Sequence, residues 1–142
     1  MRSAFVFLDY PEQDIIEFLS SNFENRNNVQ WIVRKESDPV LYIEFDKERL
    51  LLKDLEENEV NEIEKRFITF PIQILIIDIS GRHHGETELL DFLKIFLSKF
   101  EALVMDDYTE HLWTRHEIFS KVKVRNHRFF DFEGCYNEKH NK

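Results

Sequence analysis

The stretch FPIQILIIDIS, residues 70–80, is the most apolar run of this 142-residue chain, and the rest of the fold is predicted around it. Its length and its near-continuous isoleucine and leucine content are typical of a β-strand that is covered on both faces. Pro71 does not contradict this, because proline is tolerated at the start of a strand. The sequence therefore predicts a central strand here, in a sheet on which helices pack.

The segments before and after this strand alternate between strand and helix patterns. Residues 4–10, AFVFLDY, form a second apolar run, and apolar residues recur at helical spacing after Pro11. A hairpin, two further helices and a short strand are predicted at residues 29–34 with 40–46, 54–67, 86–100 and 102–105. We therefore expect one α/β domain at the α+β border, with βαβ units, three main helices and a mixed sheet of about five strands.

The C-terminal part of the chain predicts a short helix that closes the domain. Thr114 and Glu117 have the spacing of a capping box, and Trp113 and Ile118 occupy the two positions of a hydrophobic staple. The following run VKVRNHRFFDF alternates weakly between polar and apolar residues, as an added edge strand would. We place the globular domain at residues 1–134 and expect residues 135–142 to fray.

The net charge of −9 is distributed unevenly along the chain. Residues 1–114 contain 12 basic and 24 acidic residues, whereas residues 115–142 contain 7 and 4. Such an acidic body repels a phosphate backbone, so we expect no nucleic-acid partner. Complementary charge instead favours a basic protein partner, although acidity also serves simply to keep a small protein in solution.

Composition limits the compartment and the class of protein. With 42% apolar residues the chain can build a core. No apolar run approaches the roughly 18 residues that span a bilayer. The single cysteine, Cys135, has no partner for an internal disulfide, which agrees with a reducing compartment. We therefore expect a cytoplasmic protein with no membrane partner.

Two loops, residues 82–86 (RHHGE) and 106–111 (DDYTEH), collect histidines and carboxylates after two predicted strands. If those strands run in the same direction, the loops lie at the same edge of the sheet. Their nitrogen and oxygen ligands would suit zinc or manganese, so the alternative function is a small metal-dependent hydrolase. The ligands in that alternative are His83, His84, Asp106 and His111. Because the spacing contains no H-E-x-x-H motif, we predict no metal, no cofactor and no catalytic residue.

The same loops also allow a purely structural role. Arg82, at the exit of the central strand, could form an ion pair with Asp106 or Asp107 and clamp the two loops together. Thr114 and Glu117 would complete this structural clamp through the capping box. In that interpretation the two loops stabilise the scaffold and perform no chemistry.

The pattern IIDISGRHHGE, then a helix, then FEALVMDDYTEHLWTRHEI lies within residues 72–118. It resembles a pattern in small bacterial proteins, some of which are similar to immunity proteins of polymorphic or contact-dependent toxin systems. The resemblance implies a small cytosolic protein that binds and blocks one cognate toxin domain and catalyses nothing. No functional residue carries over, because immunity proteins share no common catalytic motif.

An acidic inhibitor can occupy the basic cleft of a toxin nuclease as a phosphate mimic, with a few aromatic anchors. The candidate surfaces are the acidic helix with the hairpin edge, and the loop after the last strand. The predicted partner-binding residues are Tyr42, Glu44, Asp46, Glu56, Glu57, Glu59, Glu62, Asp107, Tyr108, Glu110 and His111. A third class is a regulatory subunit that dimerises through a sheet edge, so we expect a monomer or a homodimer.

Overall fold

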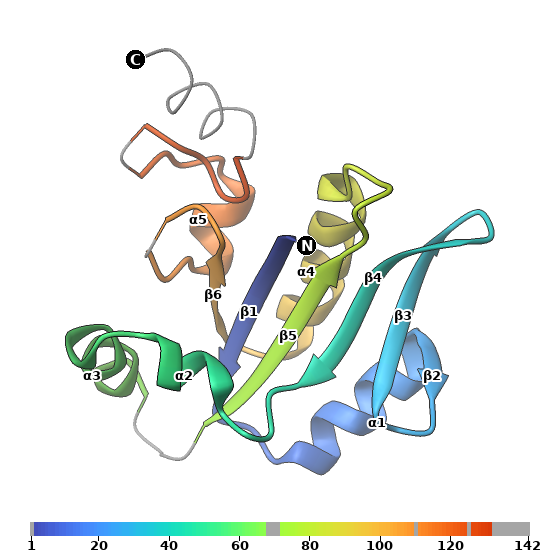
Figure 1. The fold of residues 1–142 in the computed structure, drawn as a ribbon, viewed down its shortest axis with the longest axis horizontal. Helices are drawn as coiled ribbons and strands as arrows, with labels where there is room; N and C mark the ends of the chain where they lie inside the picture. The colour runs from blue at the N-terminus through green and yellow to red at the C-terminus, as the bar shows by residue number, and fades with distance from the viewer. Residues whose placement is uncertain (1, 68–71, 110, 125, 132–142) are drawn as a thin grey trace.

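The chain forms a six-stranded sheet with helices packed on both faces (Figure 1). The computed structural model describes residues 2–67, 72–109, 111–124 and 126–131. The strands are β1 (Arg2–Leu8), β2 (Glu24–Arg26), β3 (Gln30–Lys35), β4 (Asp38–Phe45), β5 (Gln73–Ile79) and β6 (Leu103–Asp106). The helices are α1 (Glu12–Asn22), α2 (Leu50–Asp54), α3 (Glu57–Lys65), α4 (Glu86–Lys99) and α5 (Arg115–Phe119). Within these ranges, no helix has the length and apolar character that crossing a bilayer would need.

Strand β5 lies inside the sheet, whose order is β2-β3-β4-β5-β1-β6. Ile77 pairs with Ala4 of β1 on one side and with Ile43 of β4 on the other, and all three residues are fully buried. The prediction that the apolar run supplies a central strand is therefore confirmed for residues 73–79, while residues 70 and 71 lie outside the described ranges.

The predicted class, a single α/β domain at the α+β border, is confirmed. The sheet differs in detail from the expected mixed sheet, because it contains one more strand and every neighbouring pair is antiparallel. The strands β5 and β6 do run in the same direction, and α4 connects them as in a βαβ unit, but β1 lies between them. Local sequence patterns carry no information about such an insertion, since it depends on pairing between distant segments.

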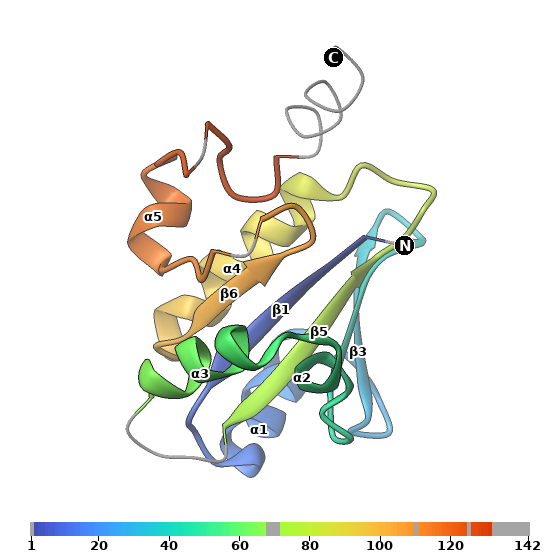
Figure 2. The same ribbon diagram turned by 60° about the vertical axis from the view of Figure 1, so that its left-hand side comes forward.

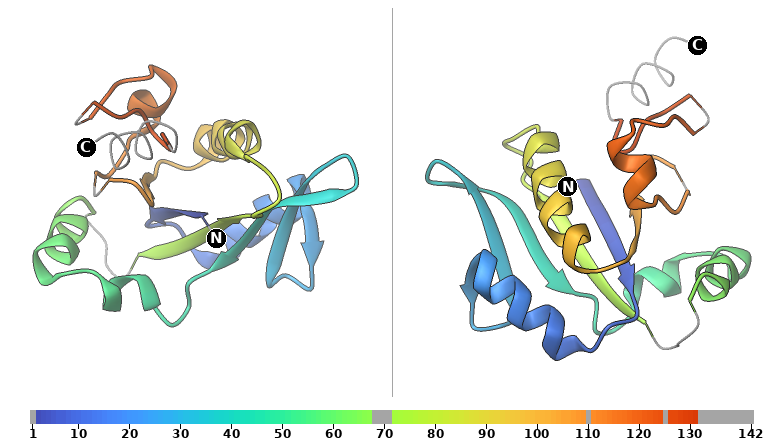
Figure 3. Two further views of the ribbon diagram at one scale, coloured as in Figure 1. Left: turned by 45° about the horizontal axis from the view of Figure 1, so that its top comes forward. Right: turned by 180° about the vertical axis from the view of Figure 1, so that it is seen from behind.

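One face of the sheet is covered by α1 and α4 (Figure 3). The two helices contact each other through aromatic rings, with centroids 6.0 Å apart for Phe18 and Phe96 and 5.0 Å apart for Phe23 and Phe92. The opposite face is covered at one end by α2 and α3 (Figure 2). Within the described ranges, this second face is therefore only half covered.

The charged segment expected as one helix over residues 54–67 is two helices, α2 and α3. A new helix begins after Glu56 because the Glu59 side chain accepts a hydrogen bond from the Glu56 backbone N–H, the return half of a capping box. The polar residues 24–26, expected as a loop, form the short edge strand β2. Both differences arise from backbone hydrogen bonds that hydrophobic periodicity does not report.

The capping box at α5 is confirmed. The Thr114 hydroxyl accepts from the Glu117 backbone N–H at 3.2 Å, and the Glu117 carboxylate accepts from Thr114 N–H at 2.9 Å. The edge strand expected in VKVRNHRFFDF is wrong for the described residues, where only an isolated bridge joins Val124 and His127. The segment instead places Phe129 and Phe130 in the core, where they are 4% and 1% exposed. The predicted frayed tail, residues 135–142, lies outside the described ranges.

Candidate functional site

The half-covered face of the sheet presents rows of cross-strand neighbours, whose side chains share one face. The row of Leu103, Phe7 and Ile74 is buried beneath α2 and α3. The next row consists of Met105, Phe5, Ile76 and Glu44. Met105 is buried, and the other three side chains are half-buried. Coverage by the helices therefore ends between these two rows.

The third row contains Ser3, Asp78 and Tyr42, all half-buried. The Ser3 hydroxyl donates to Oδ1 of Asp78 at 2.5 Å, and the Ser3 backbone N–H donates to Oδ2 of Asp107 at 2.6 Å. One residue at the beginning of β1 thus holds two carboxylates close together. We call the surface formed by Phe5, Tyr42, Glu44, Ile76, Asp78 and Asp107 the open face.

Negative charge is concentrated at the edge of the open face. Partial burial raises the pKa of Asp107; the hydrogen bond from Ser3 opposes this, and the negative charges of Asp106 and Asp78 raise the pKa further. Partial burial is the main cause of the shift, and repulsion between these carboxylates adds to it. A positive group placed on the open face would relieve that repulsion.

A groove of about 320 Å³ adjoins the open face, between α3 and the segment that follows β6. Its lining includes the acidic Glu59 and Glu62 and the apolar Ile63, together with Met105 and Leu112. Asn58, Arg66, Thr109 and His111 complete the polar lining. Because Met105 lines the groove and is the cross-strand neighbour of Phe5, the groove and the open face adjoin each other.

No protein-family model, no curated protein and no solved structure matches this chain. The resemblance to immunity proteins is therefore neither supported nor contradicted by these comparisons and stays a prediction. The function has to be argued from the geometry of the side chains.

Most of the predicted partner-binding residues lie on this surface. Tyr42, Glu44 and Asp107 belong to the open face, and Glu59, Glu62 and His111 line the groove. Glu56 and Glu57 are exposed at the beginning of α3. Tyr108 is half-buried with its ring 5.3 Å from that of Phe130, and burial raises its pKa to about 12. Glu110 lies outside the described residues.

Asp46 does not belong to an exposed acidic surface. It is 7% exposed, and its two carboxylate oxygens accept hydrogen bonds from the backbone N–H groups of Leu50 and Leu51 at 2.9 and 3.0 Å. These bonds satisfy the first free amides of α2. We therefore assign Asp46 a structural role in place of the predicted partner contact.

Arg82 does not form the predicted clamp with Asp106. Its side chain is exposed, and within the described ranges no ion pair joins it to a carboxylate. Arg2 takes its place, because the Arg2 guanidinium donates to the backbone carbonyls of His83 and His84. Asp106 is 3% exposed and accepts from backbone amides of its own loop, which reach it more directly than a side chain from the neighbouring loop.

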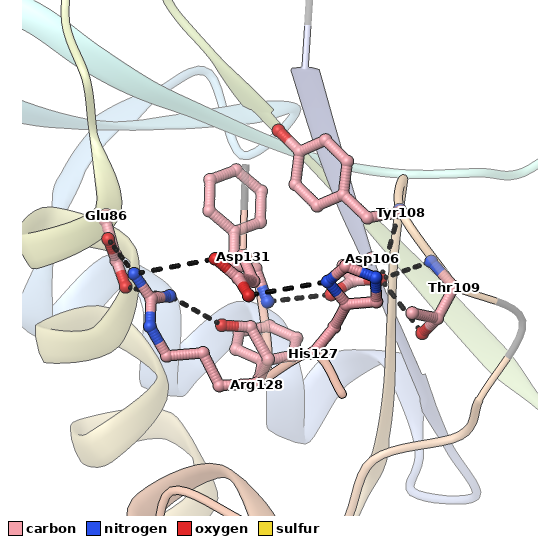
Figure 4. Close-up of polar contacts among 9 residues, drawn as sticks. Glu86, Asp106, Tyr108, Thr109, His127, Arg128 and Asp131 are labelled. Atoms are coloured by element: carbon pink, nitrogen blue, oxygen red, sulfur yellow. Dashed lines mark hydrogen bonds and ion pairs between the residues drawn. The ribbon is translucent and has the colours of Figure 1, made fainter. Parts of the chain in front are cut away.

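A polar cluster fastens the C-terminal described segment to the rest of the domain (Figure 4). Arg128 lies 2.7 Å from Glu86 at the beginning of α4 and 3.9 Å from Asp131. His127 lies 3.4 Å from Asp131, and Asp106 accepts from the Phe130 N–H. These contacts make the cluster a structural element that joins α4, β6 and residues 126–131.

Sequence reasoning missed several of these residues. Asp78 carried a visible signal, since a charged residue inside a buried apolar strand has to find a partner. The sequence around Arg2 and Arg128 gave no such signal, because each of these residues contacts a segment that is distant in the sequence.

The four residues of the alternative metal site are not brought together. His83 lies 3.7 Å from Asp38, and each of the other two histidines has its own glutamate: His84 lies 3.4 Å from Glu86 and His111 lies 3.0 Å from Glu117. Asp106 is occupied by backbone amides. In the part of the chain that the structure describes, no group of three or more histidine, cysteine or carboxylate side chains could hold a metal ion.

Proposed function

We propose that this chain is a non-enzymatic binding protein for a basic protein partner, which it contacts through the open face and the adjoining groove. The observation that carries the proposal is that the open face and the groove adjoin each other. The hairpin residue Glu44, the loop residue Asp107 and the helix residue Glu62 are far apart in the sequence, yet the rows of the sheet connect the regions in which they lie. A partner could therefore contact all three at once.

The surface combines the two chemical properties that recognise basic side chains. Carboxylates of Glu44, Asp78 and Asp107 offer charge-assisted acceptors, for which the planar arginine fork is a good match. Half-buried rings of Phe5 and Tyr42 offer apolar area, on which the aliphatic part of lysine or arginine can lie. Aromatic side chains of this kind are frequent hot spots of protein interfaces.

The specific form of this function is an immunity protein that neutralises a cognate bacterial toxin in the cytoplasm. Its support is the resemblance over residues 72–118, together with the small size and the net charge of −9. A toxin nuclease has a basic cleft for its substrate, and an acidic surface with apolar anchors can fill that cleft. In this proposal the protein needs no cofactor, and it acts as a monomer or a homodimer.

The experiment compares two charge reversals. Glu44→Lys changes the open face, whereas Glu17→Lys makes the same change on the exposed side of α1, which covers the other face of the sheet. Each purified variant is used to capture proteins from a lysate of the source cells, and the affinity of the captured protein is then measured. We expect a basic partner whose affinity falls about tenfold or more with Glu44→Lys and stays unchanged with Glu17→Lys.

A second readout tests the inhibitor role. The captured protein is expressed alone and together with each variant, and cell growth is followed. Growth arrest that wild type and Glu17→Lys relieve, and Glu44→Lys does not, would support an immunity protein. A captured partner that is acidic, or one that both variants bind equally, would contradict the proposed surface.

A further inference from the structure

A second and larger cleft, of about 750 Å³, lies at the end of the sheet where β1 ends and β6 begins. It is lined by Asp9 and Tyr10 after β1, by Arg66 and Phe67 after α3, and by residues 97–103 and 114–116. Figure 2 shows the ends of α3 and α4, and α5, along the same side of the molecule. The volume falls within the range of about 300–1,000 Å³ that is typical of small-molecule sites.

The lining of this cleft contains more basic than acidic residues, in contrast to the acidic chain as a whole. Arg66, Lys99 and Arg115 are exposed there, and within the described ranges no ion pair joins any of them to a carboxylate. The chain has 28 acidic against 19 basic residues, so a random arrangement would place acids beside these cations. Asp9 and Glu101 do line the cleft, but neither lies within ion-pair distance of the three.

The helix dipole explains the positions of two of these cations but not the position of the third. Lys99 ends α4 and Arg66 follows α3, and a positive charge near a helix C-terminus is favourable. Arg115 is the first residue of α5, where a positive charge is unfavourable. Its position therefore calls for a reason other than helix stability.

Three aromatic residues line the cleft; Tyr10 and Phe67 are half-buried, and Phe100 is buried. Tyr10, Phe67 and Phe100 contribute to the lining, and the rings of Tyr10 and Phe100 are 4.9 Å apart in an edge-to-face arrangement. Such rings provide an apolar contact area beside the three cations. A bare inorganic ion would leave that area unused.

We propose that this cleft binds a small organic anion, in which a phosphate or carboxylate group is attached to an aromatic or apolar body. Arg115, Lys99 and Arg66 contact the anionic group, and the aromatic lining contacts the body. This site is separate from the surface proposed for a protein partner, although Arg66 lines both the cleft and the groove. It gives the protein a small-molecule ligand in addition to its partner.

Titration of the full-length, isotope-labelled protein with phenyl phosphate, followed by amide NMR shifts, tests the proposal. Inorganic phosphate and sodium chloride at equal ionic strength serve as comparisons. We expect saturable shifts at residues 98–101 and 114–116, with phenyl phosphate binding about tenfold or more tightly than inorganic phosphate. Equal and non-saturating shifts with all three salts would overturn the proposal.

Charge variants then locate the site. Arg115→Gln is expected to weaken phenyl phosphate binding about tenfold, since it removes a charge-assisted donor. Lys94→Gln is the matched control, because Lys94 is exposed on α4 and does not line the cleft. If Arg115→Gln unfolds, which thermal denaturation will reveal, Lys99→Gln takes its place. Equal affinities of the cleft variant and the control would exclude this cleft as the site.

Discussion

The backbone N–H of Phe130 donates a buried hydrogen bond of 2.7 Å to Oδ2 of Asp106. Asp106 ends strand β6, and its other oxygen, Oδ1, accepts from the backbone N–H groups of Tyr108 and Thr109 at 3.1 Å each. One carboxylate therefore closes the loop after β6 and also fixes the C-terminal segment, whose Phe129 and Phe130 complete the core.

Asp106→Ala should lower the free energy of unfolding by about 3 kcal/mol, because it leaves buried backbone amides without acceptors. Urea denaturation measures the change. Asp107→Ala is the neighbouring control, since Asp107 is more exposed than Asp106 and accepts one hydrogen bond from the described residues, that of Ser3, so we expect a loss below about 1 kcal/mol. Similar losses for the two variants would show that Asp106 does not hold the C-terminal segment.

Asp107→Asn should stabilise the protein near neutral pH. Burial raises the pKa of Asp107 above its ordinary 3.8, so the folded protein binds the proton more tightly than the unfolded chain. Ionisation therefore costs stability above the folded pKa, and this cost disappears as the pH falls below 3.8. Asparagine keeps the oxygen that accepts from Ser3. Thermal unfolding over a pH series should show a small gain for Asp107→Asn that is lost in acid; a gain independent of pH would contradict this explanation.

Glu117→Gln should have the opposite pH dependence. Burial alone would raise the pKa of Glu117, but hydrogen bonds from Thr114 and His111 outweigh it and lower the pKa below its ordinary 4.5. The ionised carboxylate therefore contributes stability that is present above pH 4.5 and is lost as the pH falls through the lower, folded pKa. We expect the variant to be less stable than wild type at neutral pH and nearly equal in strong acid. The exposed Glu57→Gln, measured in parallel by thermal unfolding, should differ little from wild type at any pH.

Thr114→Ala tests the other half of the same capping box. It removes the hydroxyl that accepts from the Glu117 N–H, and loss of an N-cap side chain typically costs about 1 kcal/mol. Urea denaturation of Thr114→Ala and Thr114→Ser separates the hydrogen bond from the methyl group. Serine should restore most of the stability, whereas an equal loss in both variants would mean that the methyl group matters more.

Gly85→Ala should destabilise the protein by about 2 kcal/mol or more. Gly85 has φ +78°, and an added Cβ would lie 2.3 Å from Cγ2 of Ile79 on the central strand. Gly81→Ala is the matched control, because a Cβ there would meet nothing within 4 Å. Chemical denaturation should therefore show a larger loss of unfolding free energy for Gly85→Ala than for Gly81→Ala, although both replace a glycine of the same loop by alanine. Equal effects would show that the contact with Ile79 is not the cause.

The helices and strands that were predicted correctly are those whose formation depends on residues close together in the sequence. An unbroken apolar run made β5 a buried strand, apolar residues around more than half of its circumference made α4 a buried helix, and the spacing of Thr114 and Glu117 set the beginning of α5. Charge and composition also suggested Tyr42, Glu44 and Glu62 as parts of a contact surface, and that role stays a prediction. Each of these predictions depends on residues within one or two turns, or on one strand.

The predictions that were wrong concern residues whose contacts lie far away in the sequence. Asp46 was assigned to the surface, but a helix that begins after it buries its carboxylate. Arg82 was expected to reach Asp106, but Arg2, from the other end of the chain, holds that loop instead. A charged residue that is equally plausible as a surface group and as a cap cannot be assigned from its neighbours alone, because its burial is set by segments far away in the sequence.

The sequence by itself determined the class of the fold, the central strand and the acidic character of the surface, since hydrophobic periodicity and charge are properties of short segments. The tertiary structure alone decided that β1 lies between β5 and β6. It also decided that, within the described residues, α2 and α3 cover one end of a face and three cations without an ion pair to a described carboxylate line one cleft. These features follow from strand pairing and helix packing across the whole chain, in which many arrangements satisfy the same local pattern and only the packed core selects one.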